Sequence, residues 1–172
     1  KIKVADTGFN TTAIIEKVTE AYEYGARIIV LPELCITGYT CQDLFAQEML
    51  LTGALDGLKK IQKATVDMDA LIFVGLPMEK VGKLYNVAAA LFKGQVLGFV
   101  PKRFIPTYHE AYEGRHFAEG NEQAEEILFD GAVVPFGTDI LFEVQEGVLK
   151  GLSVACVICE DLWVPVSPSV RH

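Results

Sequence analysis

LYNVAAALFKGQVLGFVP, residues 84–101, consists of two apolar runs separated by a turn. Residues 84–92 and 95–100 are rich in Leu, Val, Phe and Ala, and Lys93 and Gly94 between them form a typical turn pair. We therefore predict two antiparallel strands joined at this turn. A hairpin of this kind makes the sheet mixed rather than purely parallel.

Apolar runs on both sides of the hairpin predict further buried strands. The runs that precede it are Ile28 to Leu31, which Pro32 stops, and ALIFVGL at residues 70–76. The runs that follow it are at residues 132–136 and 139–144, and GLSVACVI at residues 151–158 is the last long one.

Two segments before the hairpin predict helices. Residues 10–25 place apolar side chains on one helical face, with Asn10 as the expected N-cap and Gly25 as the expected stop. Residues 42–68 also favour helix, in two pieces broken near Gly53. Helices combined with a mixed sheet indicate an α/β fold in which helices cover a central sheet.

Composition narrows the class of protein. The chain has 172 residues, enough for one domain, and it is 51% hydrophobic with 15 basic and 23 acidic residues, a net charge of −8. The apolar content excludes disorder, and the negative charge argues against a nucleic-acid partner. We find no membrane-spanning run and no signal peptide, and four cysteines in a chain of this length suit free thiols in a reducing cytoplasm.

Three strong apolar runs end at a reactive residue. Glu33 follows the run ending at residue 31, Lys102 follows the hairpin, and Cys159 follows residues 151–158. Strand ends of α/β sheets commonly carry ligand-binding residues. A thiol needs a base to attack at neutral pH, a carboxylate can be that base, and a cation can stabilise the resulting oxyanion. The trio therefore indicates amide cleavage through a thioester.

Other interpretations of these residues remain open. Taken singly, Glu33 could be a solvated acid, Lys102 half of a surface basic pair with Arg103, and Cys159 a buried thiol. Cys156 and Cys159 form a C-x-x-C pair that could be redox-active or half of a metal site, although the two side chains of a continuous strand would point to opposite faces. A Cys–His pair could use His109 or His116, which lie in the long polar segment 107–126, a candidate functional loop or lid.

Three phrases identify a family resemblance. LPELCITGYTCQDLF (31–45), the segment 84–117 ending in PTYHEAYEGRHF, and VICEDLWVP (157–165) resemble the nitrilase, or carbon–nitrogen hydrolase, superfamily. They are most like the N-terminal glutaminase domain of glutamine-dependent NAD synthetases. The resemblance implies a nitrilase-like α-β-β-α sandwich with mixed sheets.

The resemblance also implies roles for single residues. Glu33 would be the general base, Lys102 the oxyanion stabiliser and Cys159 the nucleophile. Glu110, eight residues after Lys102, would be a supporting glutamate. Substrate-binding residues would be Tyr39, Tyr108 and Glu160, the last facing the amino group of the substrate.

The implied reaction is hydrolysis of L-glutamine to glutamate and ammonia. In the family, ammonia passes to a synthetase domain of the same parent chain, where ATP, Mg²⁺ and deamido-NAD are used to make NAD, and the enzymes are homo-oligomers. No cofactor and no metal is expected in the present segment. The expected location is cytoplasmic.

Measured against the family, residues 1–172 are expected to be a partial domain. The family's first strand would precede Lys1, its C-terminal part would follow residue 172, and the synthetase domain is absent. Activity is expected of the parent enzyme, and the sequence leaves open whether the segment alone is active. Two alternatives remain, namely a stand-alone nitrilase-type amidase with another substrate and a non-catalytic nitrilase-like assembly domain.

Overall fold

The computed structural model describes residues 1–109 and 111–172. Its centre is the predicted hairpin, formed by β3 (Lys83–Phe92) and β4 (Gln95–Pro101), with Lys93 and Gly94 at the turn, both at positive φ. The strands are antiparallel and pair from Phe92 with Gln95 to Val87 with Pro101. The prediction from the two apolar runs is confirmed.

The hairpin lies inside a six-stranded mixed sheet with the order β1-β2-β3-β4-β6-β5. The other members are β1 (Ile28–Val30), β2 (Leu71–Lys80), β5 (Glu125–Phe129) and β6 (Ala132–Phe136). β1 is parallel to β2, β2 is antiparallel to β3, and β4 is parallel to β6. β1 and β4 consequently run in the same direction, and their carboxyl ends lie at one edge of the sheet.

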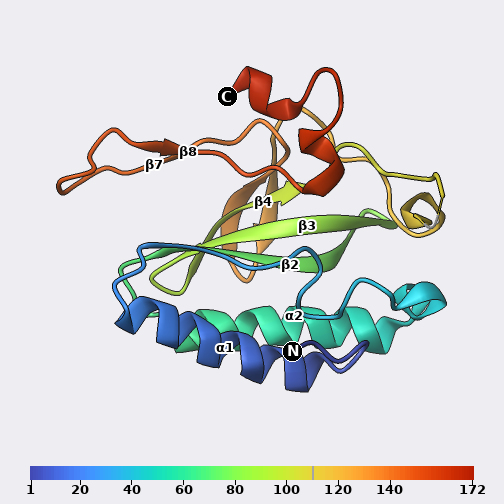
Figure 1. Cartoon of the computed structure of the whole chain (residues 1–172), viewed down its shortest axis with the longest axis horizontal. Coiled ribbons are helices and arrows are strands. Elements are labelled where there is room, and N and C mark those ends of the chain that lie inside the picture. The colour runs from blue at the N-terminus through green and yellow to red at the C-terminus, as the bar shows by residue number, and fades with distance from the viewer. Residues whose placement is uncertain (110) are drawn as a thin grey trace.

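Two helices cover one face of this sheet (Figure 1). They are α1 (Thr7–Glu23) and α2 (Glu48–Ala64). Alternate residues of β2 and β3 face them, as the period of two in a strand requires, and they join one core with the apolar stripes of both helices; this core includes Val18, Leu58, Ile72, Val74, Leu76, Val87, Ala89 and Leu91.

The opposite face carries a second, smaller layer. A two-stranded sheet of β7 (Phe142–Glu143) and β8 (Ser153–Val154) lies there, on the far side of the sheet from the helices (Figure 1). Phe142 packs edge-on against Phe73 of β2, with ring centroids 5.6 Å apart. Helix, sheet and second sheet are therefore stacked in that order, which agrees with the predicted α/β sandwich with mixed sheets.

Four short 3-10 helices complete the described structure. They are η1 (Gln42–Ala46), η2 (Glu113–Arg115), η3 (Cys159–Leu162) and η4 (Pro168–Arg171). Among the described residues, the structure has no helix that combines the length and apolar character needed to cross a bilayer.

Several local predictions were wrong at the C-terminal end. The strands predicted at 139–144 and 151–158 shorten to the two-residue β7 and β8, because they pair only with each other and the chain then bends toward η3. The prediction of a polar loop through residue 126 missed the start of β5 at Glu125, because the strand begins with two adjacent glutamates on an exposed sheet edge.

Predicted helix boundaries also shifted. Asp6, not Asn10, caps α1, since its Oδ1 accepts a hydrogen bond from the Phe9 amide at 2.9 Å. The break in residues 42–68 falls at Gln47 rather than at Gly53. Gly53 lies within α2, where a Cβ would come 2.6 Å from Oγ1 of Thr7, so its small size serves close helix packing.

β1 is less buried than its sequence predicted. Ile29 is buried, but Ile28 and Val30 are exposed, because β1 is an edge strand covered on one face.

Candidate functional site

Glu33 and Lys102 meet at the carboxyl ends of β1 and β4. Lys102 Nζ lies 2.7 Å from Glu33 Oε1. The Lys102 side chain is fully buried, whereas that of Glu33 is 18% exposed. A cation completely removed from water requires partners of opposite charge, so this pair is a built feature of the sheet edge rather than a chance surface contact.

A second carboxylate, Glu113, completes the coordination of Lys102. Glu113 Oε1 lies 2.7 Å from Lys102 Nζ and also accepts a hydrogen bond from Tyr39 OH at 2.8 Å. Glu113 was not singled out by the sequence analysis, which placed a supporting glutamate at Glu110. Glu110 lies outside the described residues, and that prediction stays untested. The sequence offered two glutamates for this role, because the phrase EAYEGRHF contains both Glu110 and Glu113.

Asn86 joins the two carboxylates from β3. Its side-chain Nδ2 donates to Glu33 Oε1 at 2.6 Å and to Glu113 Oε2 at 3.4 Å. Its main-chain carbonyl oxygen accepts a hydrogen bond from the Lys102 main-chain amide at 2.8 Å. Asn86 is 1% exposed and was also missed, because a single Asn inside an apolar strand carries no sequence signal beyond its polarity. We call Glu33, Asn86, Lys102 and Glu113 the Lys102 cluster.

The Lys102 cluster contains two carboxylates for one ammonium. Burial opposes the charge of Lys102, but the hydrogen bonds that Lys102 donates to Glu113 and Glu33 outweigh the effect of burial and raise the pKa of Lys102. Burial and the bond to Glu113 raise the pKa of Tyr39. Lys102 is therefore a cation and Tyr39 a neutral phenol at neutral pH.

Cys159 lies within electrostatic reach of this cluster. It begins η3 in the left-handed backbone region, with φ of 45°, and its side chain is exposed. Partial burial and the charge of Glu33 raise the pKa of the Cys159 thiol, Lys102 lowers it and Glu113 raises it further. The three predicted residues thus influence one another, although the described contacts include no hydrogen bond from the thiol to Glu33 or Lys102.

The predicted substrate-binding residues fall into two groups. Tyr108 OH donates to Oε2 of Glu160, the residue after Cys159, at 2.7 Å. Tyr39 contacts the Lys102 cluster, because its hydroxyl donates to Glu113. A concave surface beside Glu113 is lined largely by aromatic rings, with Tyr39, Phe45, Tyr112, His116 and Phe117 among its residues. An ion pair of 3.1 Å between Arg115 and Asp43 ties its two walls together.

A backbone crossing positions Glu33. A Cβ added to Gly75 of β2 would lie 2.5 Å from the Leu34 amide nitrogen and 2.6 Å from the Pro32 carbonyl oxygen. The segment that carries Glu33 can therefore pass over β2 only because residue 75 has no side chain.

The four cysteines are free thiols. Cys156 is partly buried and packs with the second-face core, and burial raises its pKa to about 11. Cys159 is exposed at the site. The C-x-x-C pair thus divides between two environments.

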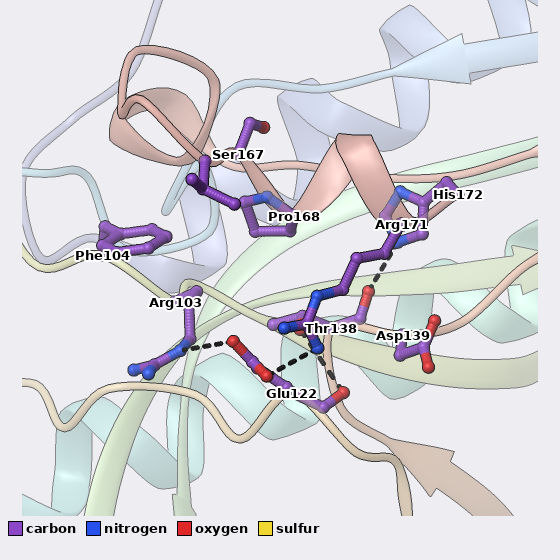
Figure 2. Close-up of a pocket in the computed structure, with 10 residues that line it drawn as sticks. Arg103, Phe104, Glu122, Thr138, Asp139, Ser167, Pro168, Arg171 and His172 are labelled. Atoms are coloured by element: carbon purple, nitrogen blue, oxygen red, sulfur yellow. Dashed lines mark hydrogen bonds and ion pairs between the residues drawn. The ribbon is translucent and has the colours of Figure 1, made fainter.

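Another pocket is lined by Arg103, Glu122 and residues of η4 (Figure 2). There Arg103 Nε lies 4.0 Å from Glu122 Oε1, and Arg171 of η4 pairs with Glu122 at 2.7 Å. His172 reaches the Thr138 carbonyl oxygen at 2.9 Å. These contacts hold η4 against the body of the molecule, and the pocket contains none of Glu33, Lys102 and Cys159.

Comparison with known proteins gives matches over nearly the whole chain. The model of the carbon–nitrogen hydrolase family matches residues 1–169. A glutamine-dependent NAD(+) synthetase of Mycobacterium bovis is 36% identical over 168 residues, 98% of this chain and 24% of the relative. The chain thus spans about a quarter of the length of the curated relatives it matches.

Solved structures show the same fold. A glutamine-dependent NAD(+) synthetase from Cytophaga hutchinsonii superposes with a TM-score of 0.78 at 32% identity, over 84% of this chain and 24% of that one. An amidase of the nitrilase superfamily from Nesterenkonia superposes with a TM-score of 0.59 at 22% identity, over 78% of this chain and 51% of that one. The α/β layers and the mixed sheet are accordingly those of the nitrilase fold.

Proposed function

The chain belongs to the carbon–nitrogen hydrolase family, and from that premise we propose that it is a glutaminase domain. It would hydrolyse L-glutamine and supply ammonia to a synthetase domain of the same parent protein, which amidates deamido-NAD to NAD with ATP and Mg²⁺. The observation that carries the proposal is a fully buried lysine held between two carboxylates next to an exposed cysteine at a strained turn. The names of the similar synthetases support glutamine as the substrate.

Glu33 is the proposed general base. The raised pKa of Cys159 keeps its sulfur protonated near neutral pH, so attack requires removal of the proton. Lys102 and Asn86 both donate to Oε1 of Glu33. In the described part of the chain no hydrogen bond reaches the other oxygen, Oε2, which leaves it available to accept the thiol proton.

Lys102 is the proposed oxyanion stabiliser. An ammonium has three N–H donors, and Glu33 and Glu113 occupy two of them. The third can meet the oxyanion that forms when Cys159 Sγ bonds to the amide carbon of glutamine. Stabilisation by one such donor lowers a barrier by roughly 3–4 kcal/mol.

The remaining steps close the cycle. The carbon–nitrogen bond breaks, and Glu33 returns its proton to the departing ammonia. Water then attacks the thioester while Glu33 takes one of its protons, glutamate leaves, and the thiol is restored. Each proton thus passes through one carboxylate that the Lys102 cluster holds in place.

Recognition of glutamine is assigned to the rim of the site. Glu160 would bind the substrate ammonium, with Tyr108 orienting its carboxylate, and Tyr39 would line the pocket. Glu110 is retained as a supporting residue. A cytoplasmic homo-oligomer is the proposed setting, supported by the free thiols and by exposed apolar residues described below.

Replacement of the nucleophile tests the proposal. In the intact gene product, C159A is expected to abolish glutamine-dependent ammonia release and NAD formation while free ammonium still supports NAD formation. C156A is the matched control, since that thiol packs against the second-face core, and it is expected to retain most of the activity. Unchanged ammonia release from C159A would refute the nucleophile assignment.

A substrate panel separates the alternatives. Preference for short aliphatic amides over glutamine in the wild-type protein would favour a stand-alone amidase. Absence of turnover with every amide, from a folded protein, would favour a non-catalytic assembly domain.

A further inference from the structure

Asp161 is a buried carboxylate that none of the proposed catalytic steps uses. It lies in η3, two residues after Cys159, and is 1% exposed. An ionisable side chain so far from water needs partners. Its partners are backbone amides of two chain segments that are distant in sequence.

The carboxylate of Asp161 holds both segments. Oδ1 accepts from the amides of Phe104 at 2.7 Å and Arg103 at 3.0 Å. Oδ2 accepts from the Arg103 amide at 3.2 Å and from the Ile158 amide at 3.4 Å. Arg103 and Phe104 directly follow Lys102, and Ile158 directly precedes Cys159.

The turn that contains Cys159 depends on these bonds. The Asp161 amide donates to the Ile158 carbonyl oxygen at 3.0 Å, so main chain and side chain of Asp161 close the turn around Cys159 from both sides. Cys159 has a φ of 45°, a conformation that a residue with a side chain adopts at a cost unless its surroundings impose it.

From these contacts we infer that Asp161 is a positioning residue, a clamp that sets the nucleophile turn at a fixed place relative to Lys102. It touches neither substrate nor reacting atoms and acts through Cys159 and Lys102. The inference rests on the proposed glutaminase function for its activity measurement only.

Substitution to asparagine tests the clamp in the intact gene product. D161N retains the shape of the side chain, but its amide group would face backbone N–H donors. We expect kcat for glutamine hydrolysis to fall at least about 10-fold, because even a small misplacement of the reacting groups slows a reaction by more than this factor. The control is D6A, which removes another carboxylate-to-amide bond, at the exposed N-cap of α1, and its kcat is expected to stay within about 2-fold of wild type.

Alkylation of Cys159 gives a measurement independent of glutaminase activity. Burial, Glu33 and Glu113 hold the thiol pKa above its ordinary value in the intact turn. A turn released by D161N is expected to remove the remaining burial of the thiol and to move it away from Glu33 and Glu113. The pH midpoint for its reaction with iodoacetamide, followed on the Cys159 peptide by mass spectrometry, should therefore move down. A D161N protein that folds, with the wild-type midpoint and a kcat equal to that of D6A, would overturn the inference.

Hydrogen exchange keeps the inference testable if D161N does not fold. In the wild-type protein, the amides of Arg103, Phe104 and Ile158 are expected to exchange at least about 100-fold more slowly than unstructured amides. Exchange of all three at the unprotected rate would overturn the clamp. Neither the alkylation midpoint nor the exchange rates depend on whether glutamine is the substrate, so failure of the proposed function is distinguishable from failure of the clamp.

Discussion

At the scale of single residues, the site is a problem of charge balance. Two carboxylates surround one buried ammonium, and a fourth titratable group, Cys159, has a pKa that all three charges shift. The two carboxylates therefore raise the pKa of both Lys102 and Cys159. Substitutions that remove one charge are expected to change both stability and thiol reactivity.

Removal of the Glu33 carboxylate should change both the rate of glutamine hydrolysis and the reactivity of the Cys159 thiol. E33Q is expected to lower the rate of glutamine hydrolysis by about 10²–10⁴-fold, the usual contribution of a general base. Because the Glu33 charge raises the pKa of Cys159, E33Q should also shift the pH midpoint of Cys159 alkylation downward. E143Q, whose carboxylate contacts only Gln145 among the described hydrogen bonds, is the control. A midpoint identical in E33Q and E143Q would contradict the electrostatic coupling.

Lys102 should make stability depend on pH in the alkaline range. Its pKa is raised in the folded protein, so the folded state holds a proton that the unfolded state releases near pH 10.4. The stabilisation is complete below that pH and is lost as pH rises through the folded-state pKa. At pH 8, the free energy of unfolding of K102M, measured in urea, is expected to be about 3–5 kcal/mol lower than that of the wild type, because the substitution leaves buried carboxylates unpaired.

The measurement is the difference in unfolding free energy between wild type and K102M. This difference should shrink as pH increases from 9 to 12. A difference that stays constant over that range would show that the charge of Lys102 does not stabilise the fold.

At the scale of elements, the site depends on how chain segments cross. β1 and β4 deliver Glu33 and Lys102 to one edge, and β3 adds Asn86 there because it runs in the opposite direction. The segment after β1 then crosses β2 at Gly75. A side chain at this crossing is incompatible with the present backbone.

G75A is therefore expected to displace the Glu33 segment. Overpacking of this kind typically costs about 1–3 kcal/mol, and glutamine hydrolysis should fall because Glu33 moves away from Lys102. The control is G8A in α1, where a Cβ would meet nothing closer than 3.9 Å. Urea unfolding and an activity assay check both variants. A G75A protein as stable and active as G8A would show that the crossing can relax without cost.

At the scale of the whole molecule, one group of the exposed apolar side chains lies near the C-terminal end of the described residues. Large apolar side chains are exposed around η3 and η4, namely Leu162, Trp163, Val166 and Val170. Trp163 is 72% exposed and is the single tryptophan of the chain. A large exposed apolar patch commonly marks a contact surface.

The proposed homo-oligomer predicts that another copy covers this patch. The emission of Trp163 in the 172-residue chain should shift to shorter wavelength as protein concentration rises, together with a larger mass by light scattering. V170D is expected to prevent both changes. An increase in mass with unchanged Trp163 emission would place the contact elsewhere.

Local sequence and tertiary packing determine different features of this protein. The hairpin at 84–100, the α/β class and the trio Glu33, Lys102 and Cys159 followed from the sequence, because apolar periodicity and strand-end residues are local properties. Glu113, Asn86 and Asp161 did not, since their importance lies in partners that are 11 to 74 residues away in the chain. Likewise, β7 and β8 are short because, among the described residues, each strand pairs only with the other. Which polar side chains share a buried charge depends on packing in three dimensions, and only the folded chain decides it.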